Sequence, residues 1–186
     1  MGRVKPARGS LPGGRASRPR PAHAAPAPGV GCAVITVSDT RTAANDPGGD
    51  LLHRLLEGAG HRVVRRAHSR DEVRGIRGVV RKALGDRGVD VVLLTGGTGI
   101  AERDRTPEAV RPLLDLELPG FGELFRMLSY DDIGSAAYLS RAAASVARGK
   151  LLFILPGSPP GVELAMRALV LPELGHALRL LGRTRS

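Results

Sequence analysis

Two kinds of hydrophobic pattern alternate along the chain. Runs of consecutive apolar residues cover 31–37, 89–94 and 151–155, and a partly polar run covers 62–67. Short, wholly apolar runs bounded by turn residues are typical of strands that are buried on both faces of a sheet. We therefore predict strands over these four ranges.

Between these runs, apolar residues recur every three or four positions, which is the spacing of a helix with one buried face. The first predicted helix begins at Asp46-Pro47, and its apolar face holds Leu51, Leu52, Leu55 and Leu56. The second follows Asp71, and its apolar face holds Val73, Ile76, Val80, Ala83 and Leu84. Further helices are predicted from Pro107, over 120–129, over 138–147 and from Pro159 toward Leu181. Pro172 is expected to bend or interrupt the last of them.

Strands and helices that alternate in this way predict an α/β fold, a three-layer α/β/α sandwich with a mostly parallel sheet. In such sheets, ligands bind beyond the carboxyl ends of the strands. Three turns follow predicted strands: Ser38-Asp39, Thr95 to Gly99, and Pro156 to Pro159. We therefore expect these three turns to meet at one edge of the sheet and to line a single pocket.

The length and composition fit one globular domain. The chain has 186 residues, of which 42% are hydrophobic, so it can bury one substantial core. No apolar run approaches the roughly 20 residues that cross a bilayer, and we expect no membrane partner. The single cysteine, Cys32, excludes an intramolecular disulfide and is expected to be a small buried side chain. These features suit a reducing compartment, and we expect a cytoplasmic protein.

The net charge of +10 is unevenly distributed. Residues 1–30 carry six basic side chains and no acidic one, so +4 remains for the rest of the chain. Residues 1–29 are rich in Pro and Arg and are expected to form a disordered arm, followed by a domain over 30–182 and a tail over 183–186. The arm has the composition of a dispensable extension, a transit peptide or a nucleic-acid-binding tail. Because it lacks aromatic residues for stacking, nucleic acid is the least favoured partner.

The glycine turn at 95–99 is the strongest candidate for chemistry. Glycines after a buried strand let the backbone approach a ligand and turn its N–H groups toward an anion. A helix start is predicted directly afterwards, with Thr106 as N-cap, Pro107 in the first turn and the acidic Glu108 behind it. The turn matches neither the Walker loop nor the dinucleotide fingerprint. The residues therefore indicate a site for a phosphorylated ligand, and the ligand itself stays open.

The motifs of the chain resemble those of the MoaB/MogA family of molybdenum cofactor biosynthesis proteins. The resemblance spans 31–181, and the segment 129–134 is more similar to MoaB than to MogA. The matching motifs are Val34 to Asp39, Thr95 to Gly99 with Arg103-Asp104 and Thr106 to Ala109, Pro119 to Glu123, Leu139 to Arg141, and Leu155 to Pro159.

The resemblance implies a molybdopterin-binding fold, a trimeric or hexameric assembly, and adenylylation of molybdopterin by ATP with Mg²⁺. By the same resemblance, Asp71 and Asp104 would hold the metal and act in catalysis. The glycine turn, namely Thr95, Gly96, Gly97, Thr98 and Gly99, would bind phosphate or nucleotide. The pterin or nucleotide pocket would be lined by Ser38, Asp39, Ser140, Arg141, Pro156, Gly157, Ser158 and Pro159.

Several alternatives stay open at this point. Asp71 and Ser158 are also good helix caps, and Arg141 would equally suit the surface of a helix. Where many members of the family carry Asp-x-Ser-Gly, this chain has Asp46 to Gly49, so one hydroxyl is lost. The resemblance also admits a non-catalytic pterin-binding or scaffold protein of the same pathway. The five histidines show no metal-ligand spacing.

Overall fold

The computed structural model describes residues 29–42 and 44–183. The predicted arm over 1–29 lies outside the described residues except for Gly29, and the predicted tail is described only at Arg183. Within the described ranges, no helix is long and apolar enough to cross a membrane.

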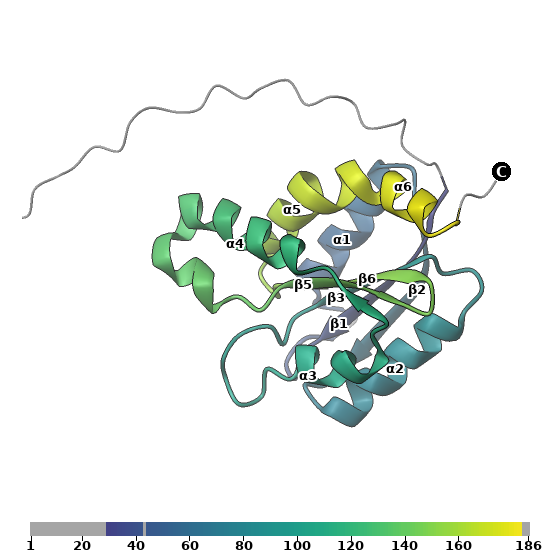
Figure 1. The fold of residues 1–186 in the computed structure, drawn as a ribbon. Coiled ribbons are helices and arrows are strands. Elements are labelled where there is room, and N and C mark those ends of the chain that lie inside the picture. Colours follow the sequence, from purple (N-terminus) through teal and green to yellow (C-terminus); the bar gives the residue numbers. More distant parts are fainter. Residues whose placement is uncertain (1–28, 43, 184–186) are drawn as a thin grey trace, which may run out of the picture.

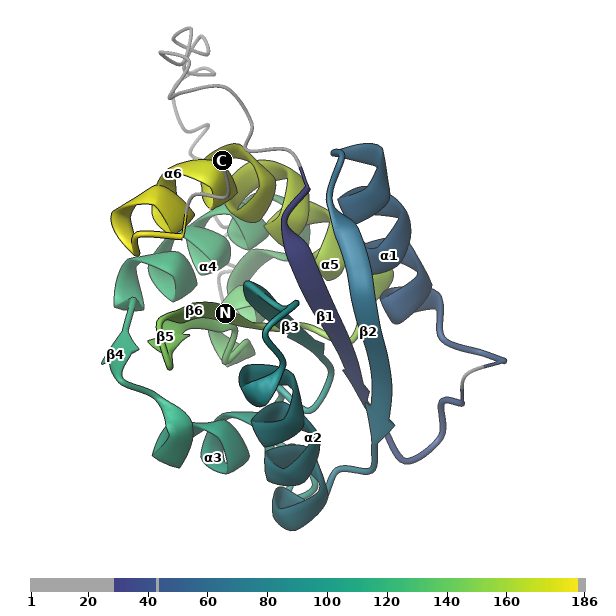
Figure 2. The ribbon, with the colours of Figure 1, turned by 90° about the vertical axis from the view of Figure 1, so that its right-hand side faces the viewer.

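A six-stranded sheet forms the middle layer, with the strand order β2-β1-β3-β6-β5-β4. The strands are β1 (Gly31–Val37), β2 (Arg62–Ser69), β3 (Val91–Thr95), β4 (Leu116–Glu117), β5 (Ala143–Ala147) and β6 (Lys150–Leu155). The pairs among β2, β1, β3 and β6 are parallel, whereas β5 and β4 are added antiparallel. The four parallel strands therefore bring their carboxyl ends to one edge of the sheet (Figure 2).

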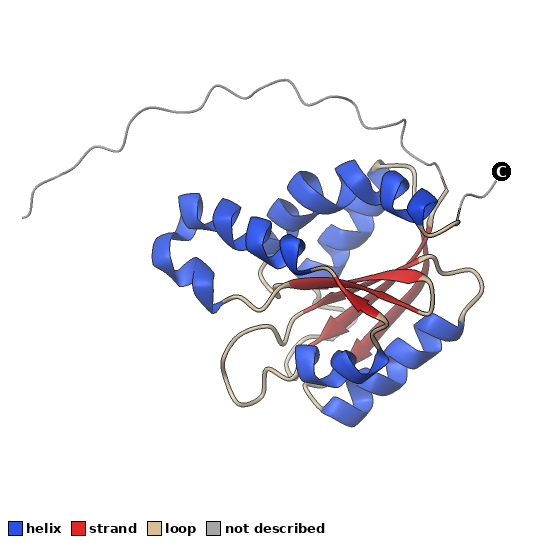
Figure 3. Ribbon diagram, in the orientation of Figure 1, coloured by secondary structure: helices blue, strands red, loops and turns tan. Residues whose placement is uncertain are grey.

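Helices cover both faces of this sheet (Figures 1 and 3). One face carries α1 (Pro47–Gly58), α4 (Pro119–Ile133), α5 (Pro159–Ala165) and α6 (Leu171–Leu180), and the other carries α2 (Val73–Gly85) and α3 (Thr106–Val110). Short 3₁₀ segments, η1 (Arg111–Leu113) and η2 (Gly134–Leu139), follow α3 and α4, and a π-helical segment, η3 (Met166–Val170), separates α5 from α6. The predicted three-layer α/β/α sandwich is confirmed.

The alternation of side chains along β1 explains why its sequence is apolar throughout. Cys32 and Val34 belong to the core under α1, whereas Ala33 and Ile35 belong to the core over α2. A strand that is buried on both faces has no position for a solvated polar residue. Burial and the nearby charge of Asp90 raise the pKa of the Cys32 thiol to about 12, so this side chain acts as a buried apolar group.

The helix predicted over 138–147 is wrong. Ala143–Ala147 is instead β5, which pairs antiparallel with β6 across a two-residue turn. Both turn residues, Arg148 and Gly149, have positive φ angles of 51° and 68°, as tight hairpins require. Pairing with β6 and burial of Ala144 and Val146 outweigh the helix preference of an alanine-rich segment.

The helix predicted from Pro107 is present but ends at Val110, after five residues. Thr106 is not its N-cap, because that position is held by Arg105 and has no capping side chain. The Thr106 hydroxyl is fully buried and donates instead to the Gly96 carbonyl, at 2.9 Å. The threonine therefore fastens α3 to the glycine turn.

The remaining predicted helices are confirmed. Asp46 caps α1 by accepting a hydrogen bond from the Gly49 amide at 2.9 Å. The apolar face of α4 holds Phe125, which is 3% exposed and stacks on Phe121. The final helix is interrupted as expected, since the π-helical turn η3 comes directly before Pro172, which has no N–H to donate.

Candidate functional site

The three turns predicted to meet do so at the carboxyl ends of the parallel strands. The Gly96 amide donates to the Leu155 carbonyl at 3.1 Å, and Arg41 donates to the Gly157 carbonyl at 2.8 Å. The turns line a cavity of about 210 Å³, which we call the carboxylate cavity. Its lining comprises Val37, Ser38, Asp39, Thr40, Arg41, Asp71, Gly96, Gly97, Arg103, Asp104 and Gly157.

The glycine turn packs against its neighbours so closely that side chains are excluded. Gly96 has a φ of +105°, and a Cβ there would lie 2.1 Å from the Val37 carbonyl oxygen. Gly97 has a φ of +62°, and a Cβ there would lie 2.7 Å from Asp71 Oδ1. The preceding Thr95 is fully buried, and its hydroxyl donates to the Pro156 carbonyl at 2.7 Å. Thr95 therefore joins two of the turns, while Gly96 and Gly97 form the cavity wall.

Asp71 follows β2 and reaches the cavity from the side of α2. Its Oδ1 is buried and has no hydrogen-bond partner among the described residues. Burial, followed by the negative charges of Asp39 and Asp104, raises the pKa of its carboxyl group. The N-cap of α2 is Glu72, so Asp71 does not cap that helix. The metal-ligand hypothesis for Asp71 thus keeps a geometric basis that the capping alternative lacks.

Asp104 lies on the loop between β3 and α3. Its Oδ2 accepts a hydrogen bond from the Ala101 amide at 3.0 Å, and a Cβ on Gly99 would lie 2.6 Å from the same oxygen. Among the described residues, no three His, Cys, Asp or Glu side chains come close enough to form a complete metal cage. Mg²⁺ usually takes one or two carboxylates and completes its shell with water and phosphate. The exposed charges and the orphaned Asp71 oxygen fit such an open site.

A second cavity of about 310 Å³ lies on the other side of the glycine turn, and we call it the apolar cavity. Its polar members are Thr98, Ser129, Asp132, Ser140 and Ser158, its apolar members are Phe125, Ile133, Leu139, Pro156, Pro160 and Leu164, and Gly99 and Gly161 complete it. The predicted single pocket is therefore two adjoining cavities.

The predicted pocket residues separate between these cavities. Ser158 lines the apolar cavity and also caps α5 through the Gly161 amide, so both of its predicted roles are compatible with the structure. Pro159, the first residue of α5, belongs to the lining of neither cavity.

Arg141 lies just before β5 rather than on the surface of a helix. It lines neither the carboxylate cavity nor the apolar cavity, but a third cavity of about 400 Å³ that Glu108 and Arg126 also line. Its guanidinium donates to the carbonyls of Gly99 and Asp104 and to the carboxylate of Glu108. These bonds hold the guanidinium against the loop and the first turn of α3.

Arg41 and Arg103 are cavity residues that were not predicted from the sequence. Both line the carboxylate cavity, and the charge of Arg103 lowers the pKa of Asp71 against the larger effects that raise it. For Arg41, the available signal was its position two residues after Asp39, in a turn that follows a predicted strand. The two guanidinium groups line the same cavity as the carboxylates of Asp39, Asp71 and Asp104. Such a mixture of charges suits a polyphosphate and a metal ion.

A further aspartate near this edge, Asp46, has a different environment from Asp71. Its side chain is fully buried and accepts hydrogen bonds from the Thr36 hydroxyl at 2.6 Å and from Arg66 at 3.3 Å, with His68 Nε2 at 3.1 Å. Burial alone would raise the pKa of Asp46, but the hydrogen bonds from Thr36 and Gly49 and the charge of His68 lower it below its ordinary value. Asp46 is thus a fully paired carboxylate.

The comparison with known sequences shows a match along most of the described domain. Residues 33–176 match the family model described as the probable molybdopterin binding domain. The molybdenum cofactor biosynthesis protein B of Halalkalibacterium halodurans is 51% identical over 151 residues, which make up 81% of this chain and 89% of that protein. The protein B of Bacillus subtilis is 52% identical over a similar share of both chains.

Solved structures show the same relationship. A crystal structure of a molybdenum cofactor biosynthesis protein B has a TM-score of 0.82 at 50% identity, and the matched region makes up 84% of this chain and 98% of the solved one. The molybdopterin biosynthesis enzyme MoaB from Thermus thermophilus has a TM-score of 0.73 at 39% identity, and it covers 82% of this chain and 96% of that chain. The family resemblance read from the motifs, and its MoaB-like character, are confirmed.

Proposed function

The chain belongs to the family of probable molybdopterin-binding domains, and from that premise we propose that it adenylylates molybdopterin in molybdenum cofactor biosynthesis. In this reaction an oxygen of the terminal phosphate of molybdopterin forms a bond to the α-phosphorus of ATP. The bond from that phosphorus to the oxygen bridging the α- and β-phosphates breaks, and pyrophosphate leaves. The product is adenylylated molybdopterin.

The observation that carries this proposal is the pair of cavities that share the glycine turn. Gly96 and Gly97 line the carboxylate cavity, whereas Thr98 and Gly99 line the apolar cavity. A transfer between two phosphorylated ligands needs two binding volumes that meet at a phosphate-binding wall. The apolar cavity suits a planar ring system, and the polar one suits the phosphates of a nucleotide.

Asp71 and Asp104 are the residues that would hold Mg²⁺. When bound, the ion would neutralise charge on the reacting phosphates and on the departing pyrophosphate. Asp71 fits this role because its buried Oδ1 has no partner among the described residues and its pKa is raised by burial and by its acidic neighbours. A carboxylate that is repelled by its own surroundings gains most from a cation.

The other residues of the carboxylate cavity would position the nucleotide. Apart from the Gly96 amide, which donates to the Leu155 carbonyl, the backbone N–H groups of the glycine turn suit phosphate oxygens. Arg41 and Arg103 supply positive charge that cannot be lost by deprotonation. Phosphoryl-type transfer depends mainly on such positioning and charge neutralisation. The chain therefore offers groups for each phosphate without needing a protein nucleophile.

A second candidate function is a non-catalytic molybdopterin-binding or scaffold protein. It is favoured by Gly48, which replaces the serine of many family members at the start of α1. A Cβ on Gly48 would lie 3.4 Å from both the Gly157 carbonyl oxygen and Thr95 Oγ1, so the missing hydroxyl would face the ligand turns. A site without this hydroxyl has one contact fewer for a phosphate.

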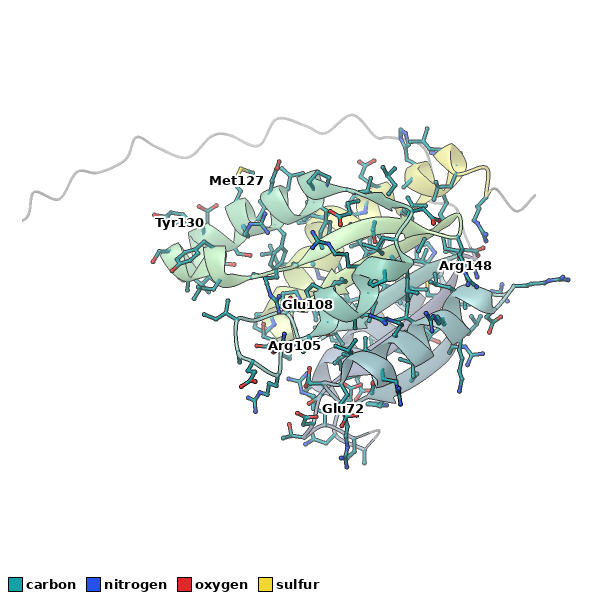
Figure 4. All side chains as sticks on the ribbon, turned by 60° about the horizontal axis from the view of Figure 1, so that its bottom comes forward. Glu72, Arg105, Glu108, Met127, Tyr130 and Arg148 are labelled. Atoms are coloured by element: carbon teal, nitrogen blue, oxygen red, sulfur yellow. The ribbon has the colours of Figure 1, made fainter. Side chains whose placement is uncertain are left out.

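We further propose that the protein acts as a homo-oligomer, in the cytoplasm, beside other enzymes of the pathway. The support for a homo-oligomer is an exposed apolar face on α4, where Met127 and Tyr130 project outward (Figure 4). Both are 60% exposed, and Leu124 and Ile133 on the same helix are also exposed. Apolar side chains grouped in this way are typical of a protein interface.

The test is to incubate the protein with molybdopterin, Mg²⁺ and ATP and to follow adenylylated pterin by chromatography. The wild-type protein should form the product, and Asp104→Asn should lower the rate about 100-fold, or about 2.7 kcal/mol in activation free energy. Asp131→Asn, an exposed aspartate on α4, is the matched control and should leave the rate unchanged. Pterin binding without product would overturn the enzyme proposal and leave the binding protein.

A further inference from the structure

The loop from Thr98 to Arg105 forms the boundary between the two cavities. It has no helix or strand, and Ile100, the first of its exposed residues, is 72% exposed. The hydrogen bonds within it are short-range: the Asp104 amide donates to the Ala101 carbonyl at 2.9 Å, the Ala101 amide donates to Asp104 Oδ2 at 3.0 Å, and Arg105 Nε donates to the Glu102 carbonyl at 2.6 Å. A loop with so few buried contacts is expected to open easily unless another element fastens it.

Arg141 fastens this loop at three points and α3 at a fourth. Its backbone amide donates to the Thr98 carbonyl at 3.0 Å, and Nε donates to the Gly99 carbonyl at 2.8 Å. The other two guanidinium nitrogens donate to the Asp104 carbonyl and to the Glu108 carboxylate. The bonds therefore reach both ends of the loop and the first turn of α3.

The base of this arrangement is rigid. Arg141 is followed by Ala142, which is 3% exposed, and by β5, which pairs with β6 in the central sheet. A guanidinium is planar and presents its N–H groups in a fixed fork, so three simultaneous acceptors fix its orientation. Because the Glu108 carboxylate accepts from the same group, the positive charge of Arg141 already has a negative partner within the protein.

The residues that Arg141 holds belong to different cavities. Thr98 and Gly99 line the apolar cavity, whereas Asp104 lines the carboxylate cavity. We infer that Arg141 is a positioning residue that fixes the loop between the cavities, so that the Asp104 carboxylate and the phosphate wall keep one relative placement. For its effect on catalysis this inference rests on the proposed function, whereas its effect on the loop does not.

The first test measures amide hydrogen exchange in the full chain. Arg141→Ala should speed exchange of the amides of residues 98–106 by about tenfold or more, and Arg141→Lys should have an intermediate effect because an ammonium cannot serve three fixed acceptors. Arg167→Ala is the matched control, since Arg167 forms an exposed ion pair with Glu163 on α5, and it should leave the loop unchanged.

Glu108→Gln is the second variant, because it keeps the arginine and removes only its anionic partner. It should speed exchange in the same loop by less than Arg141→Ala does. Unchanged exchange at 98–106 in Arg141→Ala, or an equal increase throughout the domain, would overturn the inference.

The second test separates kcat from KM in the adenylylation assay. Arg141→Ala should lower kcat about tenfold or more while KM for ATP and for molybdopterin changes less than about threefold, since most contacts in each cavity come from other elements. A raised KM with an unchanged kcat would instead show that Arg141 binds substrate. If the wild-type protein forms no product, the proposed function fails, and the exchange measurement still decides the role of Arg141.

Discussion

Asp46 and Asp71 lie at the same edge of the sheet and have opposite environments. Asp46 is fully buried and accepts hydrogen bonds from Thr36 and the Gly49 amide, with Arg66 and His68 beside it. Asp71 is half-buried, and its Oδ1 has no partner among the described residues. The pKa of Asp46 is lowered and that of Asp71 is raised.

The difference between the two aspartates separates a structural group from the metal ligand that we propose. A buried carboxylate whose oxygens all accept hydrogen bonds stabilises the fold and has no capacity left for a ligand. A carboxylate that is surrounded by other acids and left without a partner destabilises the empty protein and is suited to bind a cation. The position of an aspartate near a strand end does not decide between these roles. The number of hydrogen-bond donors that surround its carboxylate does.

The largest expected effect comes from Asp71→Asn. We expect adenylylation to fall about 100-fold, because the variant loses a metal-binding charge. Its melting temperature should rise by about 1–3 °C without Mg²⁺, because the repulsion from Asp39 and Asp104 is removed. Differential scanning calorimetry with and without Mg²⁺ is the measurement. Mg²⁺ should stabilise the wild type and not the variant, and equal stabilisation of both would remove Asp71 from the metal site.

The same substitution at the other position, Asp46→Asn, should act in the opposite direction on stability. The new amide group would meet the donors of Thr36, Arg66 and His68, which now face the carboxylate oxygen Oδ2. We expect a loss of about 2–3 kcal/mol, seen in urea unfolding, or about 5–10 °C in melting temperature. A neutral result would mean that the buried network relaxes around the amide, and the contrast with Asp71 would then weaken.

The smallest effect is a difference in pH dependence. A raised pKa makes the native Asp71 carboxyl hold its proton more tightly than the unfolded one, so its unfavourable contribution disappears as pH falls through that raised pKa. A lowered pKa makes the favourable contribution of Asp46 persist to more acidic pH, and it is lost as pH falls through the folded value.

The melting temperatures of both Asn variants and the wild type, measured from neutral to acidic pH, test this order. The difference between Asp71→Asn and the wild type should vanish at a higher pH than the difference between Asp46→Asn and the wild type. The reverse order would contradict a raised pKa for Asp71 and a lowered pKa for Asp46.

The sequence predicted most of the fold because its signals are local. The apolar runs indicated β1, β3 and β6 within a few residues, and Asp46-Pro47 indicated the start of α1. The helix predicted over 138–147 failed because alanine prefers a helix locally, whereas the pairing with β6 comes from residues outside the predicted range. The N-cap role predicted for Thr106 failed for a similar reason, since its hydroxyl has a distant acceptor in Gly96.

The candidate site was predicted in its location more than in its roles. The three turns, Asp71 and Asp104 were named from motifs and strand ends, and the structure brings them together. Arg141, predicted as a pocket residue, fastens the loop, while Arg41, which the motifs did not indicate, lines the carboxylate cavity. An arginine serves either purpose with the same chemistry, so only the positions of its acceptors distinguish them.

The sequence by itself determined most of the order of strands and helices, the edge of the sheet at which the candidate site lies, and the membership of the chain in its family. These follow from hydrophobic spacing and from motifs, which are properties of neighbouring residues. The tertiary structure decided that the expected pocket is two cavities, that Asp46 is paired while Asp71 is not, and that Arg141 holds the loop. These depend on which distant groups come within hydrogen-bonding distance, and that is set by the packing of the whole sheet and its helices.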